Sequence, residues 1–335
     1  MDKKKYSIIL PVCNGGEHVK ECVHSILAQA YTGFNLIVLD NCSTDGTSHW
    51  IQQQQDERIV YWPSEKPLSI EENWGRIQAV SKNEFMTMIG HDDILLPDYL
   101  TVMNELIENF PDASLYQTHF NYIDSAGKFI KHCKKMAAKE TAPEFLKKFL
   151  NHSIDIMGTG FMMRSKDYDA VEGIPKYPNL LFADLELWVR LTALSYKATA
   201  TTECFYYRLH DNTTKTSPDI KLQLSFEQCI MFLKELKQKD ETFNKTVVEN
   251  SIVFISYNCS SFSHRLLRTP VHKRNKLTVS SFVKKCKMYA DILVPDNSYD
   301  PTEDNKVKLA EWIDSNVVLR KLFLLFKKMY SKPLF

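Results

Sequence analysis

The sequence predicts an α/β fold with a mostly parallel central sheet covered by helices and a helical C-terminal extension. Apolar runs of strand character alternate with amphipathic helical patterns through about residue 112. Several of these runs end in carboxylates, and ligands of open α/β sheets bind outside the carboxyl ends of the strands. Lysine-rich helical sequence follows Pro218. We therefore expect a catalytic domain over residues 1–215, with halves 1–112 and 113–215, and a helical region over 216–335.

The first half contains four apolar runs that we interpret as strands. Each run is followed by a turn and then by a helical pattern, as in consecutive βα units. The turn at residues 41–46 (NCSTDG) offers Ser, Thr and Asp as helix caps. The expected strands are residues 6–12, 34–39, 58–62 and 85–89, and the expected helices begin near residues 17, 47, 70 and 97.

The order of the predicted elements changes after Asp112, where a hairpin pattern replaces the alternation of strand and helix. Residues 114–123 and 129–133 are the expected hairpin strands, joined by the turn at residues 125–128 (SAGK). Helices are expected over residues 142–150 and from Asp184 to about Leu191. Residues 196–209 form the last expected strand. We interpret Trp188 and Tyr207 as core residues.

Composition limits the possible functions. The 335 residues can bury a full core, and 42 Lys and Arg against 41 Asp and Glu argue against a nucleic-acid partner. The eight cysteines are dispersed without a CxxC pair, which favours reduced thiols over a disulfide framework or a zinc site. No apolar run has the length of a membrane span or a signal-peptide core. We therefore expect a cytoplasmic location.

Residues 85–99 (FMTMIGHDDILLPDY) hold the most informative pattern. A buried strand ends in two adjacent carboxylates, Asp92 and Asp93, before Pro97 opens a helix. A hard cation with oxygen ligands is one reason for such a pair. A strand-to-helix turn capped by Asp is the alternative interpretation.

Motifs along the first 210 residues resemble those of family 2 glycosyltransferases, which have the GT-A fold. Each motif is weak alone, but their order and spacing together are specific. They are residues 7–14 (SIILPVCN), 21–29 (ECVHSILAQ), 34–47 (FNLIVLDNCSTDGT), 73–76 (NWGR), the Asp92–Asp93 segment with Leu96 and Pro97, 183–191 (ADLELWVRL) and 207–210 (YRLH).

The resemblance implies an inverting transferase that moves a sugar from a nucleotide-linked donor to an acceptor hydroxyl. Asp40 matches the carboxylate that contacts the base, and accepting from a uracil N–H makes UDP the expected nucleotide. Arg76 matches a cation near the base or diphosphate, although a solvated helix arginine is an alternative. The implied nucleotide-sugar-binding residues are Pro11, Val12, Asn14, Asp40, Arg76, His91, Asp92 and Asp93.

The same resemblance implies that Asp92 ligates Mg²⁺ or Mn²⁺ on the diphosphate. The chain departs from the family here, because Gly90 replaces the first Asp of the motif. Mg²⁺ tolerates one carboxylate plus phosphates and waters. His210 is a second expected metal or diphosphate contact, since imidazole can ligate a metal and imidazolium can pair with phosphate. A purely structural His at a strand end is its alternative.

Asp184 matches the general base that takes the proton from the acceptor hydroxyl, and Glu186 is its nearest rival. The family commonly has Glu before this Asp, where the chain has Ala183. Capping of the following helix is the alternative role for Asp184. Residues 158–160 (GTG) resemble the acceptor-side loop and lack the third glycine of a dinucleotide fingerprint.

The segment 316–330 predicts a basic amphipathic helix. Arg320, Lys321, Lys327 and Lys328 share one arc, and apolar residues fill the rest. Such a helix can lie at a membrane surface, which we expect to be the inner face of the cytoplasmic membrane. Docking on the protein's own core is the alternative.

The sequence thus predicts a metal-assisted glycosyltransferase for hexosyl or N-acetylhexosaminyl groups. The expected partners are a UDP-sugar and a glycan or lipid-linked glycan acceptor in surface polysaccharide synthesis. A sugar nucleotidyltransferase is a rival, but it needs a glycine-rich basic loop after the first strand, where this chain has residues 13–18 (CNGGEH). An inactive binding module is the second rival, supported by Gly90 and Ala183.

Overall fold

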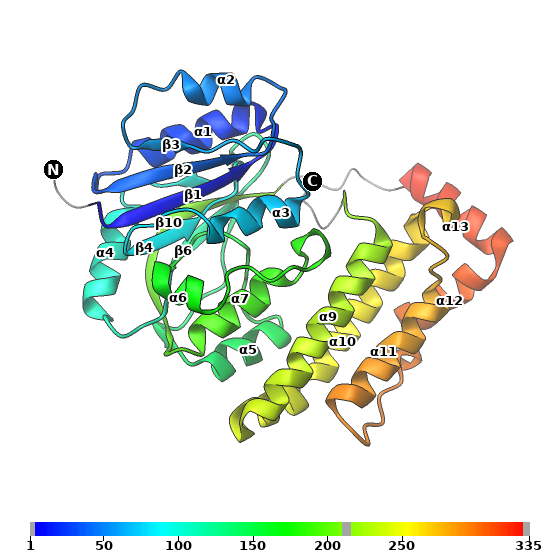
Figure 1. Cartoon of the computed structure of the whole chain (residues 1–335). Helices are drawn as coiled ribbons and strands as arrows, with labels where there is room; N and C mark the ends of the chain where they lie inside the picture. Colours follow the sequence, from blue (N-terminus) through cyan, green and yellow to red (C-terminus); the bar gives the residue numbers. More distant parts are fainter. Residues whose placement is uncertain (1–3, 210–215, 331–335) are drawn as a thin grey trace. The chain divides into compact units, whose positions relative to one another are not determined.

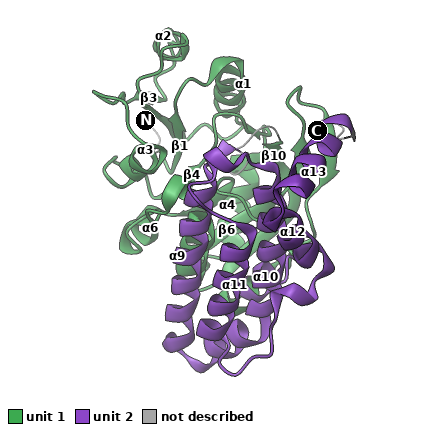
Figure 2. Ribbon diagram, turned by 90° about the vertical axis from the view of Figure 1, so that its right-hand side faces the viewer, with its two compact units in different colours: residues 1–145, 154–210 green, residues 146–153, 211–335 purple. Residues whose placement is uncertain are grey.

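The computed structural model describes residues 4–209 and 216–330, and the chain divides into two compact units. Figure 2 shows unit 1, residues Met1–Phe145 and Ile154–His210, in green, and unit 2, residues Leu146–Ser153 and Asp211–Phe335, in purple. His210, an expected metal contact, lies outside the described residues. The division of the first 215 residues into donor and acceptor halves stays a prediction.

Unit 1 is built on one sheet in which the apolar runs found in the sequence form the central strands. All seven residues of β1 are buried, because the strand has neighbours on both edges and helices over the sheet. The strands are β1 Tyr6–Val12, β2 Phe34–Asp40, β3 Ile59–Tyr61, β4 Phe85–Met88, β5 Ile94–Leu95, β6 Leu115–Ile123, β7 Phe129–His132, β8 Lys139–Glu140, β9 Phe161–Arg164 and β10 Lys197–Arg208.

The sheet is mixed, with the order β3-β2-β1-β4-β9-β6-β10-β5, while β7 pairs with β6 and β8 with β10. The ladders from β3 to β4 are parallel, as the sequence predicts, and β10 is parallel to β6. In contrast, β9 lies antiparallel to both β4 and β6. The preceding strand β8 is antiparallel to β10 and therefore runs in the same direction as β9. The helix over residues 142–150 joins β8 to β9, as the crossover that two strands of the same direction require.

The helices of unit 1 follow the expected pattern closely. Figure 1 shows α1 and α2 on one side of the β1–β3 strands and α5, α6 and α7 on the other. The helix expected from near residue 70 is a short α-helix followed by a 3₁₀ turn. The bounds are α1 Gly16–Leu27, α2 Thr47–Gln52, α3 Ile70–Gly75, η1 Arg76–Gln78, α4 Tyr99–Asn109, α5 Ala142–Leu150, α6 Ser165–Ala170, η2 Pro178–Leu180 and α7 Ala183–Thr192.

Unit 2 is helical, as expected, and α10 is its central helix. It contacts α9, α11, α12 and α13, and Asp240 caps its N-terminus by accepting from the Phe243 N–H. Leu146–Ser153 joins this unit, because Asn151 donates to Asn250 (2.7 Å) and Phe149 packs against Phe254. The bounds are α9 Asp219–Lys239, α10 Glu241–Arg268, η3 Val271–Lys273, α11 Val279–Leu293, η4 Pro301–Glu303, α12 Asn305–Ser315 and α13 Val317–Tyr330.

Within residues 4–209 and 216–330, no helix combines the length and the apolar character that crossing a bilayer requires.

Candidate active site

The first part of the site lies where β1 and β2 end together. Parallel pairing aligns Val12 with Asp40, and Pro11 and Val12 are both buried. The Asp40 side chain is 1% exposed, and its two oxygens accept from Ser43 Oγ (2.5 Å) and Tyr61 Oη (2.8 Å). Each carboxylate oxygen has two lone pairs, so this arrangement orients Asp40 and leaves it able to accept further.

Asn14 joins the loops that follow β1 and β2. The residue has a left-handed φ of 52°, which Asn tolerates better than most residues. Its backbone N–H donates to Ser43 Oγ (2.9 Å), and its side-chain oxygen accepts from the Thr44 N–H (2.7 Å). The Gly16 N–H similarly donates to the Asp45 carboxylate (2.8 Å). Asn14 therefore shapes this rim through contacts within the chain.

Arg76 lies at the same rim. Its guanidinium donates to the Asp40 carbonyl (3.1 Å) and to the Trp62 carbonyl (2.5 Å), and it lies 6.0 Å from the centre of the Trp62 ring. Arg76 and Trp62 share a hollow of about 440 Å³. This open hollow is lined by Trp62, Pro63, Ser64, Glu65, Lys66, Leu68, Arg76 and Ala79.

The second part of the site is the turn after β4, which lies at the same edge because β4 is parallel to β1. Asp93 is 2% exposed and accepts from Thr159 Oγ1 (2.9 Å) and from the Arg208 N–H (3.0 Å). Burial raises the pKa of Asp93 well above its usual range, and the neighbouring Asp92 carboxylate raises it further. Asp92 is only half-buried. The two carboxylates thus differ in burial, since Asp93 is buried and holds the turn together whereas Asp92 is half-buried.

Gly90 leaves the space that the Asp92 carboxylate occupies. A Cβ on Gly90 would lie 2.7 Å from Asp92 Oδ1 and 3.1 Å from Asp93 Oδ2, closer than ordinary contacts. His91, in the same turn, is half-buried. The departure from the family motif therefore has a steric reason in this chain, since a side chain at position 90 would displace Asp92.

Arg208 supports this turn and received no role from the sequence. The side chain is 3% exposed, its Nε donates to the Asp92 carbonyl (2.7 Å), and its Nη2 pairs with Glu21 (2.5 Å). Its Nη1 donates to the carbonyls of Asp124 (3.2 Å) and Ser125 (3.3 Å). An arginine inside the YRLH motif was the available signal, but the sequence does not show that its guanidinium joins three distant segments.

The third part of the site is Asp184, in the first turn of α7. Its side chain is half-buried, and burial raises its pKa from 3.8 to about 6 against the opposing effect of the Leu185 N–H, which donates to Oδ1 (2.9 Å). A Cβ on Gly158 would lie 4.0 Å from the Asp184 Cβ, so the loop expected to face the acceptor borders this carboxylate. This places a group that titrates near neutral pH beside that loop.

Neighbouring residues of α7 have structural roles. The rival base Glu186 is 5% exposed, accepts from Tyr177 Oη (2.6 Å) and pairs with Arg190. Trp188 is fully buried and donates from Nε1 to the Met157 carbonyl (2.9 Å), which ties α7 to the loop before β9. Glu186 is thus held by its own partners, and Trp188 is a core residue as expected.

Tyr207 is half-buried, and its ring packs against those of Tyr122 and Phe205. Burial raises the pKa of Tyr207 above the usual value, and the negative charges of Asp93, Asp92 and Asp184 raise it further. The packing against two aromatic rings agrees with the core role expected from the sequence.

The arrangement fits a single divalent cation only if the substrate supplies ligands. Among residues 4–209 and 216–330, no group of three or more His, Cys, Asp and Glu side chains is placed to hold a metal. A site with Asp92 as its one carboxylate ligand suits Mg²⁺, because proteins bind this ion through one or two carboxylates plus phosphate oxygens and waters.

Comparison with known proteins identifies the chain at this point. A family model described as "Glycosyl transferase family 2" matches residues 7–171. The crystal structure of S. aureus TarS 1–349 in complex with UDP-GlcNAc is similar with a TM-score of 0.68 and 13% identity, over 96% of this chain and 92% of that one. The family match and the fold together identify the chain as a glycosyltransferase of the GT-A fold, as the sequence predicted. Through the domain of residues 7–171 it belongs to glycosyltransferase family 2.

Two relatives illustrate the extent of the similarity. The uncharacterised glycosyltransferase MJ1057 of Methanocaldococcus jannaschii is 27% identical over 203 residues, 59% of this chain and 68% of that protein. The putative teichuronic acid biosynthesis glycosyltransferase TuaG of Bacillus subtilis is 27% identical over 233 residues, 64% of this chain and 83% of that protein. Two streptococcal glycosyltransferases are matched over only 42% and 18% of their own lengths.

Proposed function

We propose that the chain transfers a hexosyl or N-acetylhexosaminyl group from a UDP-sugar to an acceptor hydroxyl, with inversion, in the synthesis of a surface polysaccharide or lipid-linked glycan. The observation that carries this proposal is that Asp40 and Asp92 lie at the ends of the parallel strands β2 and β4, on either side of β1, while Asp184 borders the Gly158 loop. A structural neighbour that binds UDP-GlcNAc and a relative named for teichuronic acid biosynthesis support the donor and the pathway class. The proposed place of action is the cytoplasmic face of the membrane.

The proposed donor-binding rim consists of the β1, β2 and β4 ends. Asp40 accepts from the uracil N–H while Ser43 and Tyr61 hold its orientation. Arg76 contributes positive charge beside the hollow next to Trp62, which its side chain helps to line. Backbone groups of β1, the loop at Asn14 and the turn with His91 and Asp93 complete this rim.

Asp92 is the proposed carboxylate ligand for Mg²⁺ or Mn²⁺. When bound, such an ion neutralises the negative charge that develops on the diphosphate as the sugar leaves. Asp93 and Arg208 fix the backbone on either side of the Asp92 carboxylate. The space at Gly90 lets this carboxylate take its position without a clash.

Asp184 is the proposed general base. Its pKa of about 6 leaves it ionised at neutral pH and still basic enough to accept a proton. It takes the proton of the acceptor hydroxyl while the hydroxyl oxygen bonds to the anomeric carbon. The bond from that carbon to the diphosphate oxygen breaks on the opposite face, and UDP leaves. One in-line displacement of this kind inverts the anomeric configuration.

The test is UDP release from a panel of UDP-sugars with Mg²⁺ or Mn²⁺. We expect turnover with at least one sugar, and loss of turnover in Asp92→Ala and Asp184→Asn. Asp112→Asn, at an exposed carboxylate outside the site, is the matched control and should keep full activity.

Thermal unfolding with UDP and metal separates the remaining alternatives, because a ligand that binds only the folded chain raises its stability. Stabilisation by UDP in all variants except Asp92→Ala supports the division of roles. Binding of UDP without turnover of any donor would instead indicate an inactive module. Pyrophosphate release from UTP and a sugar phosphate would indicate a nucleotidyltransferase.

A further inference from the structure

One side of α13 is apolar and exposed. Between Leu322 and Met329, four apolar side chains have more than half of their surface accessible: Leu322 (56%), Leu325 (58%), Phe326 (56%) and Met329 (75%). Val318, one turn before Leu322, is 66% exposed. Soluble helices normally turn their apolar stripe toward the core. We call these five residues the α13 ridge.

The opposite side of α13 is anchored by Arg320. This side chain is only 8% exposed, donates to the Thr269 carbonyl (2.8 Å) and lies 3.7 Å from the Asp314 carboxylate. Asp314 also pairs with the buried Arg274 (2.7 Å) and accepts from the Val279 N–H (2.9 Å). This network fixes the rotation of α13 within unit 2 and directs the ridge outward.

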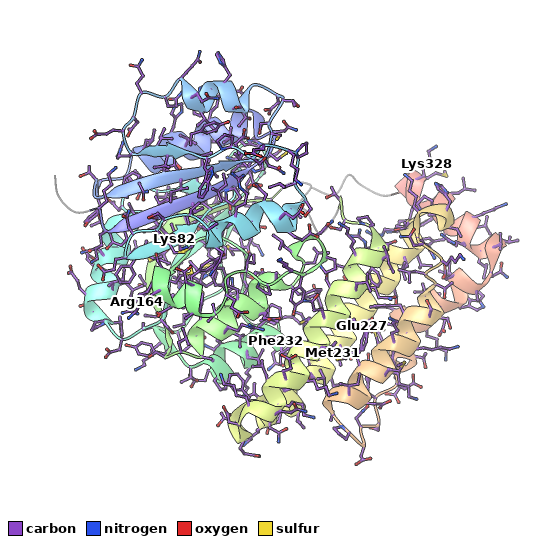
Figure 3. All side chains as sticks on the ribbon, in the orientation of Figure 1. Lys82, Arg164, Glu227, Met231, Phe232 and Lys328 are labelled. Atoms are coloured by element: carbon purple, nitrogen blue, oxygen red, sulfur yellow. The ribbon has the colours of Figure 1, made fainter. Side chains whose placement is uncertain are left out.

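The expectation that Arg320 forms part of an exposed basic arc is therefore wrong. The spacing of the basic residues is correct, but the carboxylate of Asp314 draws Arg320 inward. Lys321 and Lys328 remain exposed and lie beside the ridge on the helix surface, and Figure 3 labels Lys328 on α13. The exposed side thus combines an apolar stripe with a lysine edge.

The helix before α13 has exposed apolar residues of its own. Leu309 (50%) and Trp312 (59%) lie one turn apart on α12, and Val317 at the start of α13 is 70% exposed. Contiguous exposed apolar residues of this kind mark surfaces that contact a partner or a membrane. Tryptophan in particular is enriched at the interface between a bilayer and water.

We propose that the α13 ridge docks on a lipid bilayer that contains anionic lipid. The ridge enters the boundary between headgroups and acyl chains, and Lys321 and Lys328 contact lipid phosphates. A second copy of the chain fits this surface less well. The α13 helix has no acidic residue, so two copies would bring lysines against lysines, whereas anionic phosphates complement them. This inference does not depend on the proposed reaction.

The test is co-sedimentation of the full chain with vesicles of phosphatidylcholine alone or with one third phosphatidylglycerol. We expect binding to the anionic vesicles and weak binding to the neutral ones. Lys321→Gln with Lys328→Gln should weaken anionic-vesicle binding roughly thirtyfold, since each basic residue contributes a factor of about five. Leu322→Gln with Leu325→Gln should weaken it at least tenfold.

Matched controls are available on α11, where Lys284, Lys287 and Met288 are exposed. Lys284→Gln with Lys287→Gln, and Met288→Gln, should bind vesicles like the unaltered chain. All altered positions are at the surface, so the midpoint of thermal unfolding should stay unchanged, which verifies that the fold is intact.

Equal binding by the ridge variants and the controls would overturn the proposal. So would a chain that binds no vesicle and forms a dimer in light scattering that Leu322→Gln with Leu325→Gln converts to a monomer. That result would assign the ridge to a second copy. Because the assay contains no nucleotide sugar, an inactive chain that binds vesicles would refute the proposed reaction without affecting this inference.

Discussion

Gly90→Ala tests the steric reason given for the missing first Asp of the motif. The added methyl would lie 2.7 Å from Asp92 Oδ1 and 3.1 Å from Asp93 Oδ2. Asp93 is buried and held by two hydrogen bonds, so Asp92 is the group that can move. The backbone itself is no obstacle, because Gly90 is not among the glycines with positive φ.

The size of the displacement determines the expected effect. Asp92 must move roughly 0.7 Å to reach ordinary contact with the methyl, whereas metal–ligand distances tolerate about 0.2 Å. Misplacement of this size in a metal site typically costs ten- to a hundredfold in metal affinity or activity. We therefore expect kcat/KM to fall by about ten- to a hundredfold, while stability falls by only about 1 kcal/mol because the site is partly open.

The assay is UDP release as a function of Mn²⁺ concentration, together with thermal unfolding. Higher Mn²⁺ should partly restore the rate of Gly90→Ala, because the defect lies in metal affinity. Gly75→Ala is the control, since nothing lies within 4 Å of a Cβ there and the backbone is helical (φ −61°). Wild-type activity and an unchanged Mn²⁺ dependence in Gly90→Ala would refute the steric argument.

Three further predictions concern charge and positioning. Activity of the unaltered chain should rise with pH to a plateau above about pH 6, because Asp184 must be ionised, and a plateau from pH 4.5 in kcat/KM would contradict this role. Because the pKa of Asp184 is raised in the folded chain, ionising this carboxyl destabilises the fold, and the free energy of unfolding declines as the pH rises from about 4 to 6. Asp184→Asn removes this cost and should raise the free energy of unfolding above pH 6 by about 2 kcal/mol. This gain, measured by denaturant titration, should vanish at pH 4. Arg208→Lys keeps the positive charge but loses the forked donors of the guanidinium, so the free energy of unfolding should fall by about 3 kcal/mol and kcat should change by a larger factor than KM. UDP binding does not require Asp184, so a fall in UDP affinity as large as the fall in kcat would instead indicate general unfolding.

The sequence predicted the strands and most of the helices, because the spacing of apolar residues and the residue types of turns can be read over a few neighbouring positions. β1, the apolar run before Asp40 and the strand before Asp92 were all predictable in this way. The antiparallel placement of β9 was not, because the residue pattern of a strand is the same whichever end of the sheet the strand enters from.

The candidate site was also predictable only in part from the sequence. A motif with its order and spacing identifies Asp40, Asp92 and Asp184 as candidates, since each follows or begins an element. Which of two adjacent carboxylates is buried depends on distant partners, here Thr159 and Arg208 for Asp93. Sequence distance hides such pairings, so the supporting role of Arg208 could not be read from the motif.

The sequence by itself determined the family, the fold class and the amphipathic character of α13, because these depend on residue types and their spacing. Only the tertiary structure decided which side of α13 faces outward and why Gly90 stands before Asp92. The first depends on Arg320, which donates to the Thr269 carbonyl 51 residues away. The second depends on the turn that brings two carboxylates against Gly90, in which the distant Thr159 and Arg208 hold Asp93. Burial and close packing act through space, and spacing along the chain does not record them.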